Sequence, residues 1–249
     1  KAAWYEYEAV STDNERDGLR AAFGRPLRVL PQLDRARVVA CFDADPLFEH
    51  PAAVLLARRF AESRDPHRPE GMSRLYVVEA GYSLTGGRAD HRLAVPASQV
   101  AGALAALATA VMERLGTPVP AAVVRAGAGQ EHSAFAARLA SDLLAHRGAG
   151  AILVGPRQSP FAHALAAALN VALGNSGAVI SYLELADPDR PSHLAAIREL
   201  SRRMAEGSVQ TLLILAGNPA YDAPADLRFG ELLRRVPNAL HLSLYDDET

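Results

Sequence analysis

The turn Gly217-Asn218-Pro219 has residue types that could bind a phosphate group. The glycine permits a positive φ and a close backbone approach, the asparagine offers a side-chain amide, and the proline fixes the exit of the turn. Backbone N–H groups at such a turn can point at a bound anion. The alternative interpretation is an ordinary strand-to-helix turn built from standard turn residues.

This segment occurs twice, because Val38–Pro51 repeats the pattern of an apolar run, a polar turn, a proline and a second proline five residues later. Asp43 and Asp45 replace Ala216 and Asn218 in the earlier copy. Two ionised carboxylates beside a phosphate would each cost on the order of 1–2 kcal/mol even at a high effective dielectric constant. We therefore expect the earlier turn to be unsuited to an anion. Two acids at this spacing could alternatively hold Mg²⁺ or form a solvated turn.

Three further features could carry chemistry. Gly174 and Asn175 follow an alanine-rich stretch, where a helix-capping turn and a ligand contact are both possible. Asp90 and the histidine after it suggest a catalytic pair, although a structural aspartate that anchors its loop is the simpler interpretation. The single cysteine, Cys41, lies in an apolar run and excludes an internal disulfide or a cluster ligated by several cysteines within this sequence.

The overall composition is that of a globular domain. Hydrophobic residues make up 49% and charged residues 22% of the 249 residues, and the net charge is −2. This charge gives no electrostatic case for binding nucleic acid or an anionic membrane. No apolar run approaches the roughly 20 residues that span a bilayer, so direct membrane insertion is not expected.

The elements that would position these residues alternate between strands and helices. The predicted strands are Val38–Phe42, Leu75–Glu79, Ala151–Val154, Ala178–Leu183, Thr211–Leu215 and Ala239–Leu244. The predicted helices are Ala52–Ser63, Ser98–Leu115, Gln130–His146, Phe161–Leu173, Ser192–Glu206 and Ala225–Arg235. This alternation predicts an α/β fold of two Rossmann-like, mostly parallel sheet units with helices on both faces.

We place a domain boundary in the Gly/Pro-rich segment Gly116–Pro120. Residues 1–118 then form a first unit with the Asp-Ala-Asp-Pro turn, and residues 119–249 a second unit with the Gly-Asn-Pro turn. Both ends of the sequence look cut, so we expect an excised domain whose second unit is truncated at its C-terminal end.

Taken in order, these motifs resemble the molybdopterin oxidoreductases, the superfamily of dimethyl sulfoxide reductase and formate dehydrogenase. Members commonly have a strand followed by G-x-N-P where the dinucleotide part of the pterin binds, and this chain has Ala216-Gly217-Asn218-Pro219 at such a place. The segment Thr85–Val95 is similar to the family's T-x-x-A-D element, and Gly174-Asn175 to its Gly-Asn-x-Gly element. Asp246 and the final Glu-Thr pair match the family's late aspartate and E-T pair. The resemblance implies that these residues belong to a cofactor site, with Asp43 and Asp45 as its degenerate counterpart.

The departures point to one branch of that superfamily. No cluster-binding cysteines are present, and Ser11 is the main candidate for the protein ligand that catalytic members supply to molybdenum. The chain is most similar to the degenerate molybdopterin-like domain in the large iron–sulfur subunit of alternative complex III. That resemblance implies a non-catalytic scaffold without a cofactor or metal of its own. The iron–sulfur clusters would lie elsewhere, in the longer protein of which this sequence would be a part.

The same resemblance implies other subunits of a quinol-oxidising respiratory complex as partners. The fragment itself would be soluble and held at the periplasmic face of the membrane through those partners. Two alternatives remain open. The first is a genuine domain that binds molybdopterin guanine dinucleotide, and the second is an α/β domain that binds a mononucleotide or another small molecule.

Overall fold

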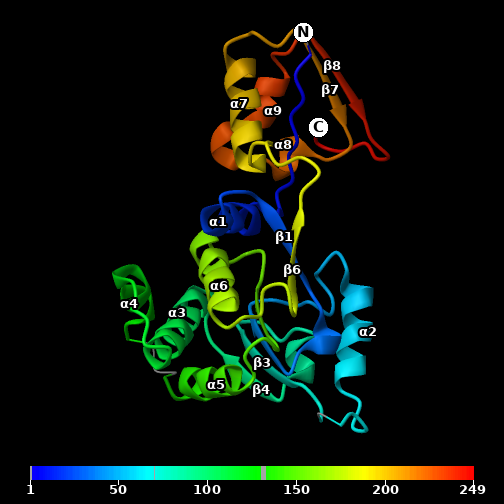
Figure 1. Ribbon diagram of the computed structural model, residues 1–249. Helices are drawn as coiled ribbons and strands as arrows, with labels where there is room; N and C mark the ends of the chain where they lie inside the picture. The colour runs from blue at the N-terminus through cyan, green and yellow to red at the C-terminus, as the bar shows by residue number, and fades with distance from the viewer. Residues whose placement is uncertain (1, 70, 130–132) are drawn as a thin grey trace. The chain divides into compact units, whose positions relative to one another are not determined.

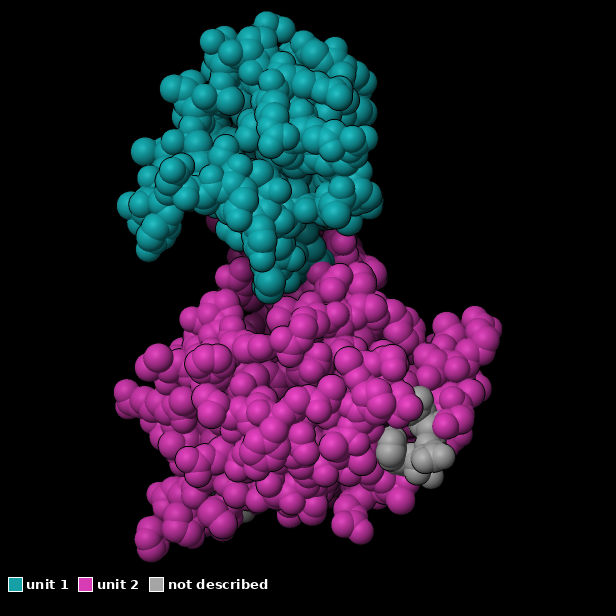
Figure 2. Space-filling model, turned by 180° about the vertical axis from the view of Figure 1, so that it is seen from behind, with its two compact units in different colours: residues 1–13, 189–249 teal, residues 14–188 magenta. Residues whose placement is uncertain are grey.

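The computed structural model describes residues 2–69, 71–129 and 133–249, which form two compact units (Figure 2). Unit 2 comprises Asn14–Pro188, and unit 1 combines the segment before it with the segment after it. This division differs from the predicted 1–118 and 119–249, because a strand that follows residue 118 pairs with a strand that precedes it. The two units are described separately below.

Unit 2 is built around a four-stranded parallel sheet. Its strands are β2 (Val38–Phe42), β3 (Arg74–Glu79), β4 (His91–Ala94) and β5 (Gly150–Val154), in the order β4-β3-β2-β5. β2 is buried along its whole length, as expected for a central strand with neighbours on both sides. The predicted parallel α/β fold is confirmed here. Of the four strands of this sheet, only β4 was not predicted, because just two of its four residues, Leu93 and Ala94, are apolar.

Helices cover both faces of this sheet (Figure 1). One face packs against α3 (Ala97–Arg114), α5 (Ser133–Ala145) and α6 (Pro160–Ala172), beside which lies α4 (Ala121–Gly127). The other face packs against α2 (Ala53–Ser63) and the short helix η1 (Leu33–Arg35). The first three residues of the predicted helix Gln130–His146 lie outside the described residues.

Side chains alternate between the two faces, as strand geometry requires. In β2, Val38, Ala40 and Phe42 enter the core beneath α3, α5 and α6, whereas Val39 and Cys41 enter the core beneath α2. Cys41 is therefore a small buried hydrophobe, as the sequence indicated, and burial raises the pKa of its thiol.

The strand predicted at Ala178–Leu183 is found as β6 (Ile180–Glu184), but it is not part of the parallel sheet. It pairs antiparallel with β1 (Leu27–Pro31), which follows α1 (Asp13–Phe23). The reason lies at the free edge of β5, where buried asparagine side chains already bind the outward backbone groups. Ile152 N donates to Asn170 Oδ1 at 3.1 Å, and Asn170 Nδ2 donates to Ile152 O at 2.8 Å. A further strand would therefore find the backbone groups in the middle of this edge already occupied.

Unit 1 contains a two-stranded parallel sheet of β7 (Thr211–Leu215) and β8 (Asn238–Leu242). Its core forms against α7 (His193–Ala205) and α9 (Phe229–Leu233). The remaining elements are α8 (Pro219–Asp222) and the short helix η3 (Ala225–Leu227).

The helix predicted at Ala225–Arg235 is interrupted. Arg228 adopts a left-handed conformation with φ 51°, and this residue separates η3 from α9. Among the described residues, no helix of either unit is both long enough and apolar enough to cross a membrane.

Candidate functional site

The first residue of each repeated turn has the same left-handed backbone conformation. Asp43 and Ala216, the first residues after β2 and β7, have φ values of 52° and 60°. A left-handed conformation is uncommon for residues other than glycine. Asp43 N donates to Val78 O at 2.7 Å, and Ala216 N donates to Leu242 O at 2.9 Å. In each turn the neighbouring parallel strand therefore holds the same backbone N–H.

In the first turn, Asp45 is bound by the loop that follows β3. Thr85 Oγ1 donates to Asp45 Oδ1 at 2.5 Å, and Thr85 N donates to the same oxygen at 3.1 Å. Leu84 N donates to Asp45 Oδ2 at 3.2 Å, and Leu47 N donates to Thr85 Oγ1 at 3.3 Å. Both Asp45 and Thr85 are buried. The carboxylate joins two loops and is not presented to solvent.

In the second turn, Asn218 has an equivalent threonine partner. Thr249 Oγ1 donates to Asn218 Oδ1 at 2.7 Å, and Ala220 N donates to Thr249 Oγ1 at 3.0 Å. Ala220 follows Asn218 by two residues, as Leu47 follows Asp45. Thr249 thus takes the place of Thr85.

The residue before each threonine completes the correspondence. Leu84 offers its backbone N–H to Asp45, whereas Glu248 offers a carboxylate to Asn218, whose Nδ2 donates to Glu248 Oε2 at 2.5 Å. The pKa of Glu248 is lowered, first by this hydrogen bond from Asn218. In the first turn the Asp45 carboxylate accepts hydrogen bonds from its neighbours, and in the second turn the Asn218 amide donates to the Glu248 carboxylate. The side chain of each turn residue therefore has hydrogen-bond partners within the protein.

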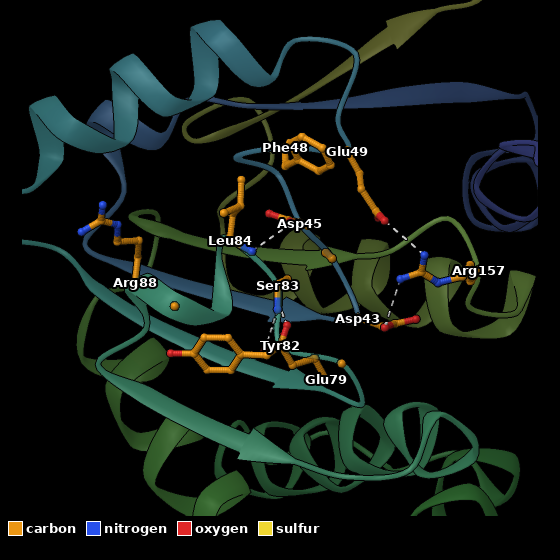
Figure 3. Close-up of a pocket in the computed structure, with 13 residues that line it drawn as sticks. Asp43, Asp45, Phe48, Glu49, Glu79, Tyr82, Ser83, Leu84, Arg88 and Arg157 are labelled. Atoms are coloured by element: carbon orange, nitrogen blue, oxygen red, sulfur yellow. Dashed lines mark hydrogen bonds and ion pairs between the residues drawn. The ribbon is translucent and has the colours of Figure 1, made fainter.

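A cavity of about 650 Å³ lies at the carboxyl ends of β2 and β3 (Figure 3). Within it, the exposed Arg157 bridges two acids: its Nη1 lies 3.1 Å from Glu49 Oε1, and its Nη2 lies 3.5 Å from Asp43 Oδ1. Gln158 Nε2 also donates to Asp43 Oδ2 at 3.1 Å. We expected Asp43 and Asp45 to place two carboxylates beside any bound anion. Both residues line the cavity, but their partners differ, because Asp43 contacts Arg157 whereas Asp45 binds the Thr85 loop.

The neighbouring strands β2 and β5 form the switch point of the sheet, because α2 and α6 leave them toward opposite faces. Open α/β sheets bind ligands at such a point. Here the loops that follow β2 and β5 contact each other. Gly155 N donates to Phe42 O at 2.9 Å, and a Cβ on Gly155 would lie only 1.6 Å from Asp43 O. The two loops touch through their backbones, and Arg157 and Gln158 hold the Asp43 side chain above them.

The second turn differs because it remains accessible. Gly217 has φ 71° and no atom within 4 Å of the position that a Cβ would occupy. A cavity of about 440 Å³ nearby is lined by Ala220, Arg234, Glu248 and Thr249, among others. The guanidinium of Arg234 and the hydroxyl of Thr249 in this lining could contact a small anionic group.

Gly174 and Asn175 lie in unit 2, whereas Gly217, Asn218 and Pro219 lie in unit 1. Gly174, with φ 74°, follows α6 as a helix-ending glycine. Asn175 is fully buried: its Oδ1 accepts from Gly150 N at 3.1 Å, and its Nδ2 donates to Asn170 Oδ1 at 3.1 Å. In this structure, its amide supports β5.

The structure also places the remaining candidates Asp90 and Ser11. Asp90 receives a bidentate contact from Arg64 and a hydrogen bond from Leu75 N at 2.8 Å, so it anchors its loop. Burial raises the pKa of Asp90, but the hydrogen bonds from Arg64 and Leu75 N, together with the positive charge of Arg64, lower it overall. Ser11 Oγ accepts from Asp13 N at 3.4 Å, at the start of α1.

Asp246 is exposed. The neighbouring Asp247 makes the contacts in this part of unit 1. Its carboxylate accepts hydrogen bonds from Thr249 N at 3.0 Å and from Ser243 Oγ at 3.4 Å. Within the described residues, no group of three or more His, Cys, Asp and Glu side chains is arranged to hold a metal ion.

Sequence reasoning missed the role of the two threonines as partners of the turn residues, and a signal for it exists. Phe42 pairs with Val78, and Leu215 pairs with Leu242. Thr85 and Thr249 each follow that paired residue by seven positions (78 to 85 and 242 to 249). The repeat thus extends from strand–turn–Pro to a threonine after the next strand. No protein-family model matches this chain, and no curated protein matches its sequence significantly.

Proposed function

We propose that this chain is a non-catalytic α/β domain, similar to those of molybdopterin oxidoreductases, that serves as a scaffold and partner surface. The observation that supports this most directly is the contact between the loops that follow β2 and β5. Asp43 is held there by Arg157 and Gln158, and Gly155 lies against the backbone of Asp43. A pterin dinucleotide does not fit the first turn in this arrangement, because its phosphates would have to displace these contacts next to a carboxylate.

The parent protein, in this proposal, is the large iron–sulfur subunit of a membrane-associated, quinol-oxidising respiratory complex on the periplasmic face. Its clusters would lie outside this sequence, and its partners would be other subunits of the complex. This part of the proposal rests on the ordered sequence motifs alone. The geometry adds that the turn residues are already matched by protein groups, which suits a structural role.

A second candidate function is supported by the second turn, where Gly217 is open and Arg234 lines the adjacent cavity. In this alternative, unit 1 binds a mononucleotide or another small anionic molecule. Guanine nucleotides are the relevant probes, because a pterin guanine dinucleotide is the cofactor that the motifs imply. A genuine molybdopterin guanine dinucleotide-binding oxidoreductase, with Ser11 toward the metal, is the remaining alternative.

A thermal-shift titration with GMP and GDP separates these functions. The scaffold proposal predicts no concentration-dependent shift in melting temperature for the unsubstituted 249-residue chain (the parent chain). A shift abolished by Arg234→Ala but kept in Arg235→Ala, whose side chain does not line the cavity, would establish the second candidate. A shift abolished by Arg157→Ala would contradict the scaffold proposal at its central point, because it would place the nucleotide at the first turn.

A further inference from the structure

One face of the sheet in unit 1 is apolar and exposed. Leu213, Leu215, Leu240 and Leu242 lie on it, and between 49% and 68% of each is exposed. Leu213 pairs with Leu240 and Leu215 with Leu242, so the four side chains form one contiguous patch across the two strands. Parallel sheets are normally covered on both faces. An uncovered parallel sheet of leucines therefore calls for a partner.

The opposite face of the same sheet is packed in the usual way. Leu212, between the exposed residues of β7, contacts the cluster of Ile197, Leu200, Met204 and Phe229 from α7 and α9. Figure 1 shows α7 and α9 on one side of the β7–β8 pair. The two faces thus differ in covering more than in composition, because apolar side chains lie on both, and Thr211, Asn238 and His241 are the polar residues of the two strands.

The patch has the size of an interaction site. At the 60–120 Å² that corresponds to burying one such side chain, the four sheet leucines offer on the order of 240–480 Å² of apolar surface. Patches of this size on monomers are often functional. A stable interface buries about 800 Å² on each partner, so the four leucines would supply up to roughly half of one side.

The charge pattern suits a like partner. The exposed positions of the two strands are Thr211, Asn238, Ala239 and the four leucines, so none of them carries a charge. In a twofold dimer each residue near the axis meets the same surface of the other copy, and like charges there would repel. This face has none, while the acidic Asp246 and Glu248 follow in the segment beyond β8.

We propose that this leucine face is the interface of a twofold homodimer of the chain, in which the β7–β8 sheets of two copies pack face to face. Sheets packed in this way lie about 10 Å apart with interleaved side chains. Such packing would bury the leucines of both copies at once. It is independent of the proposed scaffold role, because it involves neither turn.

Sedimentation velocity of the 249-residue chain over a wide concentration range tests this directly. The parent chain should sediment as a dimer. The double variant Leu213→Glu/Leu240→Glu should sediment as a monomer with unchanged far-UV circular dichroism. Val54→Glu, on an 88% exposed apolar position of α2, is the matched control and should remain dimeric. A monomeric parent chain, or a dimer that both variants retain, would overturn the proposal.

A cysteine variant keeps the test valid if the glutamates prevent folding. The only native cysteine, Cys41, is fully buried and contributes no background. Leu213→Cys should give a disulfide-linked dimer under mild oxidation, and Val54→Cys should not. A Leu213→Cys chain that stays uncrosslinked, or crosslinks no more than Val54→Cys, would exclude this face as the contact.

Discussion

Asp45 and Thr85 are joined by a 2.5 Å hydrogen bond between side chains that are both buried, and Asn218 and Thr249 repeat this relationship at 2.7 Å in the other unit. In each case the threonine comes from the loop after the neighbouring parallel strand and also accepts a backbone N–H from the turn. The internal repeat is therefore a repeat of hydrogen bonds as well as of residues. It links the loops after two adjacent strands at the edge where a cofactor would otherwise be expected.

Replacing Asp45 with asparagine should lower the free energy of unfolding. Asparagine turns one acceptor oxygen into a donor facing the N–H groups of Leu84 and Thr85, and a buried donor left without an acceptor costs about 1–3 kcal/mol. Urea unfolding measures the change. Asp17→Asn, an exposed acid on α1, is the control and should stay within about 0.5 kcal/mol of the parent chain. Equal stability of the two variants would show that the Asp45–Thr85 contact is unimportant.

The reciprocal change, Asn218→Asp, should raise the pKa of Glu248. The parent asparagine donates to Glu248 and lowers the pKa of that carboxyl group. The variant removes this donor and places a second negative charge beside Glu248, which favours its protonated form. A pH titration of the Glu248 side chain by NMR would detect the upward shift. An unchanged titration would mean that the two side chains are apart in solution.

Gly155→Ala should destabilise unit 2 strongly. The added methyl group would lie 1.6 Å from Asp43 O, so the loops after β2 and β5 would have to separate. We expect a loss of about 3 kcal/mol or more in unfolding free energy, at the upper end of single substitutions. Gly81→Ala is the control, because its added Cβ meets no atom within 4 Å and its φ is not positive. A tolerated Gly155→Ala would indicate that the crevice at the switch point is open.

The buried His163 should make unit 2 less stable in mild acid. Burial lowers its pKa from 6.5 to about 4, although backbone contacts to Gly155 and Gln158 partly oppose this. The folded state therefore keeps His163 neutral while the unfolded chain takes up a proton below about pH 6.5. Its contribution is full above that pH and is lost progressively as the pH falls toward 4, by about 3 kcal/mol in total.

The measurement for His163 is urea unfolding between about pH 7 and pH 4.5, in the parent chain and in His163→Gln. The difference between the two should shrink or reverse as the pH falls, because glutamine cannot be protonated. His67→Gln, at an exposed histidine, should follow the parent chain at every pH. Parallel curves for the parent and His163→Gln would contradict the assignment.

Much of the fold could be predicted because buried strands are visible in sequence. β2 and β7 begin and end where the apolar runs Val38–Phe42 and Thr211–Leu215 begin and end. β6 was predicted as a strand of a mostly parallel sheet, but it pairs antiparallel with β1. The apolar residues of β6 do not distinguish these two arrangements. The deciding factor is Asn170, whose side chain occupies the edge of β5.

The candidate site shows the same limit. The two polar turns and the later Thr85 and Thr249 could be read from the sequence, but as separate elements. Their pairing depends on which strands are neighbours, which local patterns do not specify. Arg157 carried no signal at all, since an arginine after β5 reaches Asp43 only because β2 and β5 are adjacent in the sheet.

The central claim, that the chain is a scaffold without a pterin, is tested most directly by the molybdenum and pterin content of the purified protein. Elemental analysis for the metal, and fluorescence of the oxidised pterin released by heat or acid, should both give values far below one equivalent per chain. Stoichiometric molybdenum together with pterin would contradict the claim, and would require Arg157 and Gln158 to release Asp43 when the cofactor binds.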